Sequence, residues 1–206
     1  MSHSSLWGID RNWSGKQLIE YKNSWLFCPV VWNVLLCKYI EEEERTDFGR
    51  ALTDYMSWVG IFAGPTAKER WSMLNERINN SSIQYDRVLW ELSNLSVFNT
   101  KDKDFVAECI ERFVENNMVG TSEYRDSAHI IERFRWIARD IINLPRRVKY
   151  FVFKGTSVDD CVERWFRRKR LCSWKEFVCE FTLIEDQKVT GFATNLEMCK
   201  EAQTAL

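Results

Sequence analysis

Turn-forming residues are scarce in this 206-residue chain, and apolar residues recur along it at helical spacing. Its eight Gly and three Pro are too few for an all-β chain, which needs a turn about every ten residues. Between positions 25 and 40 the apolar residues surround most of a helical cylinder, so we expect a buried helix beginning near Pro29. Asn33 and Lys38 interrupt this stretch, which is also too short to span a bilayer.

Helical periodicity and end signals predict a succession of further helices. A helix beginning at Asp47 is followed by Gly64 and Pro65, which end it, and Thr66 with Glu69 has the spacing of a capping box for the next one. A short helix is expected after Ser14, preceded by an ordered loop at 6–13. The other expected helices cover 83–95, 102–117 and 122–143, and three more begin at 157, 173 and 195.

One segment alternates as a strand does. In RRVKYFVFK, at 146–154, Val148, Tyr150 and Val152 share a face, and 181–189 is the expected partner. The sequence therefore predicts an all-α or nearly all-α protein. We expect one compact domain, 1–206, with about 8–10 helices and at most a small β-hairpin near 146–154 and 181–189.

Cysteine usage indicates free thiols. The seven cysteines form no C-x-x-C pair, and several fall on apolar helix faces, where Cys behaves as a small hydrophobe. We therefore expect neither disulfides nor a zinc site, as in a cytoplasmic protein. The segment 1–15 lacks the apolar run of a signal peptide. The expected location is the cytoplasm, away from the membrane.

Charge is unevenly distributed although the net charge is only −1. The region 146–175 holds ten Lys or Arg residues against three acids, so it carries +7 while the rest carries −8. In a helix from Val158, the pairs Asp160–Arg164 and Glu163–Arg167 have the favourable i,i+4 order, and an ordinary helix end explains that part. Arg168, Lys169 and Arg170 have no acidic partner nearby in sequence.

Arg-rich surfaces bind phosphates and carboxylates, and exposed Trp on a helix is typical of protein-binding hot spots. Trp90 and Trp136 lie off the best apolar stripes of their helices, so we expect both to be partly exposed. The candidate binding residues are Arg146, Arg147, Lys149, Arg164, Arg167, Arg168, Lys169, Arg170 and Trp136.

Catalytic motifs are weak or missing. The segment Arg125-Asp-Ser-Ala-His129 resembles the Arg-x4–6-His motif of HEPN-type ribonucleases, which are also helical, but only three residues intervene. The resemblance implies a His acting as general acid or base beside a polarising Arg. Cys161 and Arg167 have the C-x5-R spacing of tyrosine phosphatases, without the small residues of that loop. No nucleotide-, metal- or serine-nucleophile motif is present, so we expect no enzyme activity, no cofactor and no metal.

Two functions remain open from the sequence. The first is a non-enzymatic interaction protein, of the immunity or phage anti-defence type, that inhibits another protein or a protein–nucleic-acid complex. The alternative is a module that binds DNA or RNA through the basic region 146–175.

Overall fold

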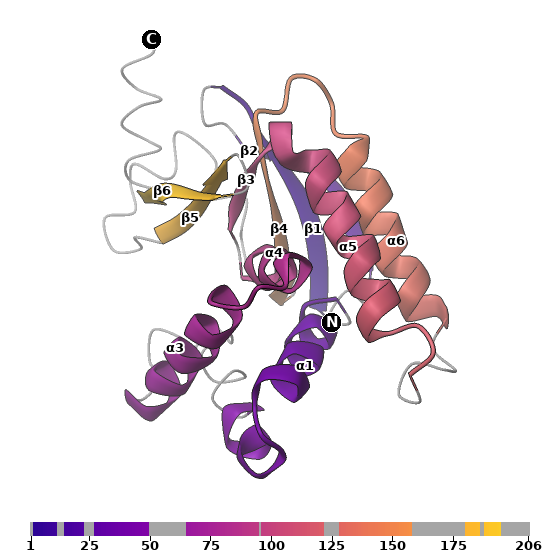
Figure 1. Cartoon of the computed structure of the whole chain (residues 1–206). Helices are drawn as coiled ribbons and strands as arrows, with labels where there is room; N and C mark the ends of the chain where they lie inside the picture. The colour runs from indigo at the N-terminus through magenta and orange to yellow at the C-terminus, as the bar shows by residue number, and fades with distance from the viewer. Residues whose placement is uncertain are drawn as a thin grey trace.

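The computed structural model describes residues 2–11, 15–22, 27–49, 65–94, 96–121, 128–157, 180–185 and 188–194. Within them, six strands form one mixed sheet in the order β2-β1-β4-β3-β5-β6, with helices packed beside it (Figure 1). The first four strands of that order are antiparallel, and β5 runs parallel to β3. The prediction of an all-α fold with at most a small hairpin is therefore wrong.

Strand β1 (Ser2–Ile9) is central and was misread as a loop, and β2 (Gly15–Lys22) replaces the helix expected after Ser14. β1 pairs with β2 along one edge and with β4 (Tyr150–Ser157) along the other. Its polar residues Ser4 and Ser5 are buried along with Leu6, Trp7 and Ile9, so the alternation that marks a half-buried strand is absent. The main partner of β1 also lies about 150 residues away, which short-range patterns do not reveal.

The expected hairpin is also wrong in its pairing. β4 and β5 (Glu180–Glu185) are both strands, but β3 (Val97–Asn99) lies between them. β5 instead pairs with β6 (Lys188–Thr194). β4 begins at Tyr150, so the basic residues at 146–149 form the turn that leads into it.

The helix predictions fared better. α1 (Phe27–Tyr39), α3 (Pro65–Asn79), α4 (Gln84–Ser93), α5 (Lys103–Asn117) and α6 (Ala128–Ile142) confirm five of them. Residues 122–127, the expected start of the last one, lie outside the described residues. Of the helix expected from Asp47, residues 45–49 are helical and the rest lies outside the described residues. Two short 3-10 helices, η2 (Glu42–Glu44) and η4 (Thr100–Asp102), complete the described helical segments. Ser157 ends β4, and the helices expected beyond it lie outside the described residues.

Aromatic side chains join the helices to the sheet. The Phe27 ring of α1 lies 4.6 Å from the rings of Phe134 on α6 and of Phe153 on β4. All three side chains are fully buried, so one cluster holds two helices against the central strands. Trp90 belongs to the same core: it is 0% exposed and donates a 2.8 Å hydrogen bond to Asn75. The prediction of a partly exposed Trp90 is therefore wrong, because this polar partner lets the indole be buried off the apolar stripe.

A buried carboxylate ties three helices together. Asp86 on α4 is 0% exposed and accepts a 2.7 Å hydrogen bond from the Tyr39 hydroxyl. Its second close partner is the Lys38 ammonium, at 2.8 Å, and the Asn117 amide of α5 also donates to it at 3.4 Å. Lys38 in turn donates to Asn117 at 3.1 Å, which closes the network. Removing one partner from such a network destabilises the fold, because it leaves a buried charge that is only partly compensated.

This network predicts a strong coupling between Lys38 and Asp86. Lys38→Met should lower the free energy of unfolding by about 2–3 kcal/mol, because it leaves a buried carboxylate without its cation. The double variant Lys38→Met/Asp86→Leu should lose less than the sum of the two single changes, with a coupling of about 1–3 kcal/mol. The exposed i,i+4 pair Glu108–Arg112 is the control, with an expected coupling below about 0.5 kcal/mol. Urea unfolding of each variant measures these values, and equal couplings would contradict the account.

The described cysteines differ in exposure. Cys28, Cys37 and Cys109 are free thiols, as predicted, and the four others lie outside the described residues. Cys37 is exposed, whereas Cys28 and Cys109 are buried. Burial raises the pKa of the Cys109 thiol to about 12, and the nearby Glu108 carboxylate adds to the rise.

The extent of alkylation should differ between the exposed Cys37 and the buried Cys109. At about pH 8.5, iodoacetamide should modify Cys37 in the folded protein and leave Cys109 unmodified, because the thiolate is the reactive form. In about 6 M guanidinium chloride both should react at similar rates. Peptide mass spectrometry reads out each site separately. Equal alkylation of Cys37 and Cys109 in the folded protein would show that the α5 core is open.

Candidate functional site, a basic pocket at one end of the sheet

Three neighbouring strands meet in one row at an end of the sheet. Ile9 of β1 pairs with Tyr150 of β4, and Tyr150 pairs with Asn99 of β3. Because these strands are antiparallel, the C-terminal end of β1, the N-terminal end of β4 and the C-terminal end of β3 lie at the same end of the sheet. The residues just beyond this row therefore come close together although they are far apart in the sequence.

Each of the three segments contributes cations beyond the row. Arg11 follows β1, Lys101 follows β3, and the turn before β4 supplies Arg146, Arg147 and Lys149; all five side chains are exposed. They line one pocket of about 580 Å³, and its eight described lining residues include no acid. These lining residues are Arg11, Asn99, Thr100, Lys101, Arg146, Arg147, Val148 and Lys149.

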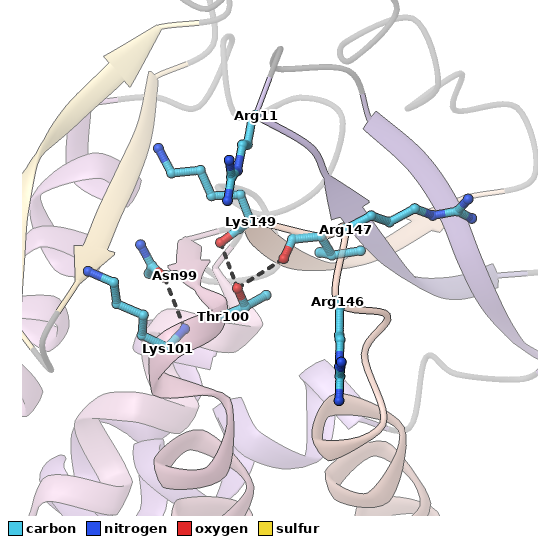
Figure 2. Close-up of a pocket in the computed structure, with 8 residues that line it drawn as sticks. Arg11, Asn99, Thr100, Lys101, Arg146, Arg147 and Lys149 are labelled. Carbon is cyan, nitrogen blue, oxygen red and sulfur yellow. Dashed lines mark hydrogen bonds between the residues drawn. The ribbon is translucent and has the colours of Figure 1, made fainter.

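The five cations do not all point the same way. In Figure 2 the charged ends of Arg11, Lys101 and Lys149 lie on the same side of the view; Lys101 and Lys149 extend outward, and Arg11 points down toward the pocket. Arg147 extends to the opposite side of the view and Arg146 points down past the pocket. The basic surface thus has a group of three cations, Arg11, Lys101 and Lys149, and two arginines on its rim.

Backbone hydrogen bonds hold the turn in place. The Lys149 N–H donates to the Ile9 carbonyl at 2.8 Å, and the Thr100 N–H donates to the Lys149 carbonyl at 3.0 Å. The Thr100 hydroxyl lies 3.0 Å from the carbonyl oxygens of Val148 and Lys149 (Figure 2). The Lys149 ammonium lies 4.8 Å from the centre of the Tyr150 ring, a cation–π contact. The cations therefore project from a backbone that needs little ordering when a ligand binds.

The uncharged donors in the pocket already have partners. The Thr100 hydroxyl donates to the carbonyls of the turn, and its N–H is used by Lys149. The Lys101 N–H donates to the Asn99 side-chain oxygen at 2.9 Å, which caps η4. These groups form part of the wall, and the five charged side chains make up most of the remaining lining.

Four acidic residues lie near the lining residues in the chain or in the sheet register. Asp102 is buried at the end of η4, and Asp104 opens α5. On the other flank the register of β3 with β5 pairs Phe98 with Ile184, so Glu185 follows at the level of Asn99. Asp10 lies between Ile9 and Arg11 and has interactions of its own. The five lining cations still outnumber these four neighbouring acids.

The structure brings together part of the predicted site. Arg146, Arg147 and Lys149 share the pocket, whereas Arg164, Arg167, Arg168, Lys169 and Arg170 lie outside the described residues. Trp136 is 47% exposed on α6, as predicted, and is not among the lining residues.

Arg11 and Lys101 were missed by the sequence reasoning. Their only signal is their position just after β1 and β3, and the prediction had read β1 as a loop.

Other chemistry was sought in the described residues. His129 is exposed on α6, and Arg125, its partner in the ribonuclease resemblance, lies outside the described residues. No group of three His, Cys, Asp or Glu residues that could hold a metal occurs in the part of the chain that the structure describes. None of the described helices combines the length and apolar character needed to cross a bilayer.

Gly8 of β1 lies under the pocket wall. A Cβ atom at this position would come within 2.8 Å of both the Leu18 and the Val148 side chains. Val148 is one of the lining residues and is only 6% exposed, so it has little room to move. The close approach of the β1 backbone at Gly8 to Val148 thus fixes how far the turn before β4 lies from β1.

Gly8→Ala is therefore expected to destabilise the protein by about 1–3 kcal/mol through overpacking against Val148. Gly49→Ala is the matched control, because among the described residues its Cβ would meet Leu36 alone, at an ordinary 3.6 Å. Thermal unfolding of both variants compares them. A Gly8→Ala protein as stable as the control would contradict the tight contact.

Comparison with known protein families, with curated protein sequences and with solved structures finds no significant match for this chain.

Proposed function

We propose that the protein binds nucleic acid through the sugar-phosphate backbone at the basic pocket. The observation that supports this is the joining of five cations from three chain segments in a single concave site with no acid among its described lining residues. A concave surface of one charge sign concentrates the electrostatic field and attracts polyanions. The divergence of Arg146 and Arg147 from the other cations suits an extended ligand better than a single small anion.

The composition of the pocket favours nucleic acid over an acidic protein. Stable protein interfaces are centred on apolar or aromatic side chains that become buried together. Val148 is the one apolar side chain among the described lining residues, and it is already buried. Phosphate-backbone binding needs no apolar centre, because its free energy comes from counterion release and charge pairing.

The rest of the charge distribution supports an oriented approach. The net charge is −1, so the protein has no overall attraction for a polyanion. The exposed acids Glu41 to Glu44 follow the C-terminus of α1, which leads away from the pocket end of the sheet (Figure 1). A ligand is thus attracted at the pocket end and repelled at the other.

One observation favours the second function, binding to a protein. Trp136 is half-exposed on α6, and Glu132 and Arg139 beside it form a 2.9 Å ion pair on the same helix. An aromatic side chain inside a polar rim is the usual form of a hot spot. Inhibition of a partner protein stays a prediction. This surface of α6 is where such a partner would bind.

Salt-dependent binding tests the nucleic-acid proposal. A labelled 20-base-pair duplex should bind at about 50 mM salt, with a slope of log K against log salt approaching −4.5 if all five cations contact phosphates. The double variant Arg146→Gln/Arg147→Gln should reduce the slope by about 1.8, since each lost contact contributes about 0.9. Fluorescence anisotropy over a salt series measures both values.

The control variant is Arg112→Gln, which removes an exposed arginine of α5 that pairs with Glu108. Its slope should equal that of the unchanged protein. Absence of binding at about 50 mM salt would refute the proposal, because electrostatic association is strongest there. Equal slopes for the control and the double variant would place the binding surface elsewhere.

A further inference from the structure

We infer that Arg11, Lys101 and Lys149 form a subsite for the terminal phosphate of a nucleic-acid strand, here called the end subsite. This inference rests on the proposed function and adds which part of the ligand the pocket selects. The charged ends of these three cations lie on one side of the view, whereas Arg147 extends to the other side and Arg146 points down (Figure 2). The pocket therefore has one region of high charge density and a more dilute rim.

Register explains why this density is built into the fold. The row Ile9–Tyr150–Asn99 aligns three strand ends, and the three cations lie one or two residues beyond it. The Lys149 backbone is bonded on both sides, to Ile9 and to Thr100. The Tyr150 ring lies under the Lys149 ammonium and is only 9% exposed, so the ring itself is fixed.

Charge density distinguishes a strand end from the interior of a strand. An internal phosphodiester carries one negative charge, whereas a terminal phosphate monoester carries about −1.5 to −2 at neutral pH and offers three acceptor oxygens. Three cations on one side of a pocket are matched to the second species, since each additional charge on the ligand interacts with all three. Arg146 and Arg147 are then left for the monoanionic phosphates that follow along the strand.

The inference predicts a preference among DNA ends. A DNA hairpin labelled in its loop has one blunt end, which can carry a 5′-phosphate, a 3′-phosphate or only hydroxyl groups. The form with a terminal phosphate should bind about three- to tenfold more tightly than the hydroxyl form. A closed dumbbell without ends should bind like the hydroxyl hairpin. The 5′ and 3′ forms show which terminus supplies the phosphate.

Substitutions in the pocket test which residues produce the preference for a terminal phosphate. Lys149→Gln should remove the difference between the phosphate and hydroxyl hairpins, and Arg11→Gln is a second variant in case the first folds poorly. Arg147→Gln is the matched control: it lies two residues from Lys149, extends the other way, and should weaken both hairpins equally. Thermal unfolding checks that each variant is folded.

The pH dependence gives an independent readout. The second ionisation of a phosphate monoester has a pKa of about 6, so the preference should grow as the pH rises from about 5 to about 7.5. The hydroxyl hairpin at each pH corrects for titration of the protein, including Asp10, Asp102, Asp104 and Glu185 around the pocket. No histidine occurs among the described lining residues.

The outcomes separate the two proposals. Equal affinity for all hairpins and for the dumbbell, with a clear salt slope, would overturn the end subsite and leave nucleic-acid binding in place. A preference for terminal phosphate that Lys149→Gln and Arg11→Gln both leave unchanged would also overturn it. No binding of any hairpin at about 50 mM salt would overturn both proposals.

Discussion

The pairing of β1 with β4 is the constraint on which the rest of the structure depends. It joins the first strand to residues about 150 positions later, and β3 then adds to the other edge of β4. The core forms on this frame, with Phe27 packed on both Phe134 and Phe153 and with Asp86 linking α1, α4 and α5. The same frame sets the basic pocket, since the Lys149 backbone bonds to Ile9 and to Thr100. Fold and candidate site therefore have one structural origin.

The sequence revealed the helices better than the sheet, for a physical reason. α5 and α6 have one buried stripe each, which local periodicity detects. β1 is buried along both edges and includes the buried Ser4 and Ser5, so it lacks the alternation of a half-buried strand. Charge counting found Arg146, Arg147 and Lys149, but Arg11 and Lys101 join them only through strand register. Long-range pairing carries that information, and no local pattern encodes it.

The pocket shows how a nearly neutral protein can present a cationic site. Its cations are exposed at the ends of buried strands, where the chain leaves the sheet. The uncharged donors close to them are used within the wall, by the turn carbonyls and by the Asn99 cap. Such a surface attracts phosphate groups through its charge and gives little discrimination among bases.

The most direct measurement is an NMR titration of the ¹⁵N-labelled protein with a short DNA duplex at low salt. The account predicts that amide signals of residues 9–11, 99–101 and 146–150 shift together and saturate at one stoichiometry, because they share one site. The indole signal of Trp136, which lies on α6 and is not among the lining residues, should stay in place. Shifts confined to Trp136 and its neighbours, with the pocket amides unchanged, would contradict the central claim.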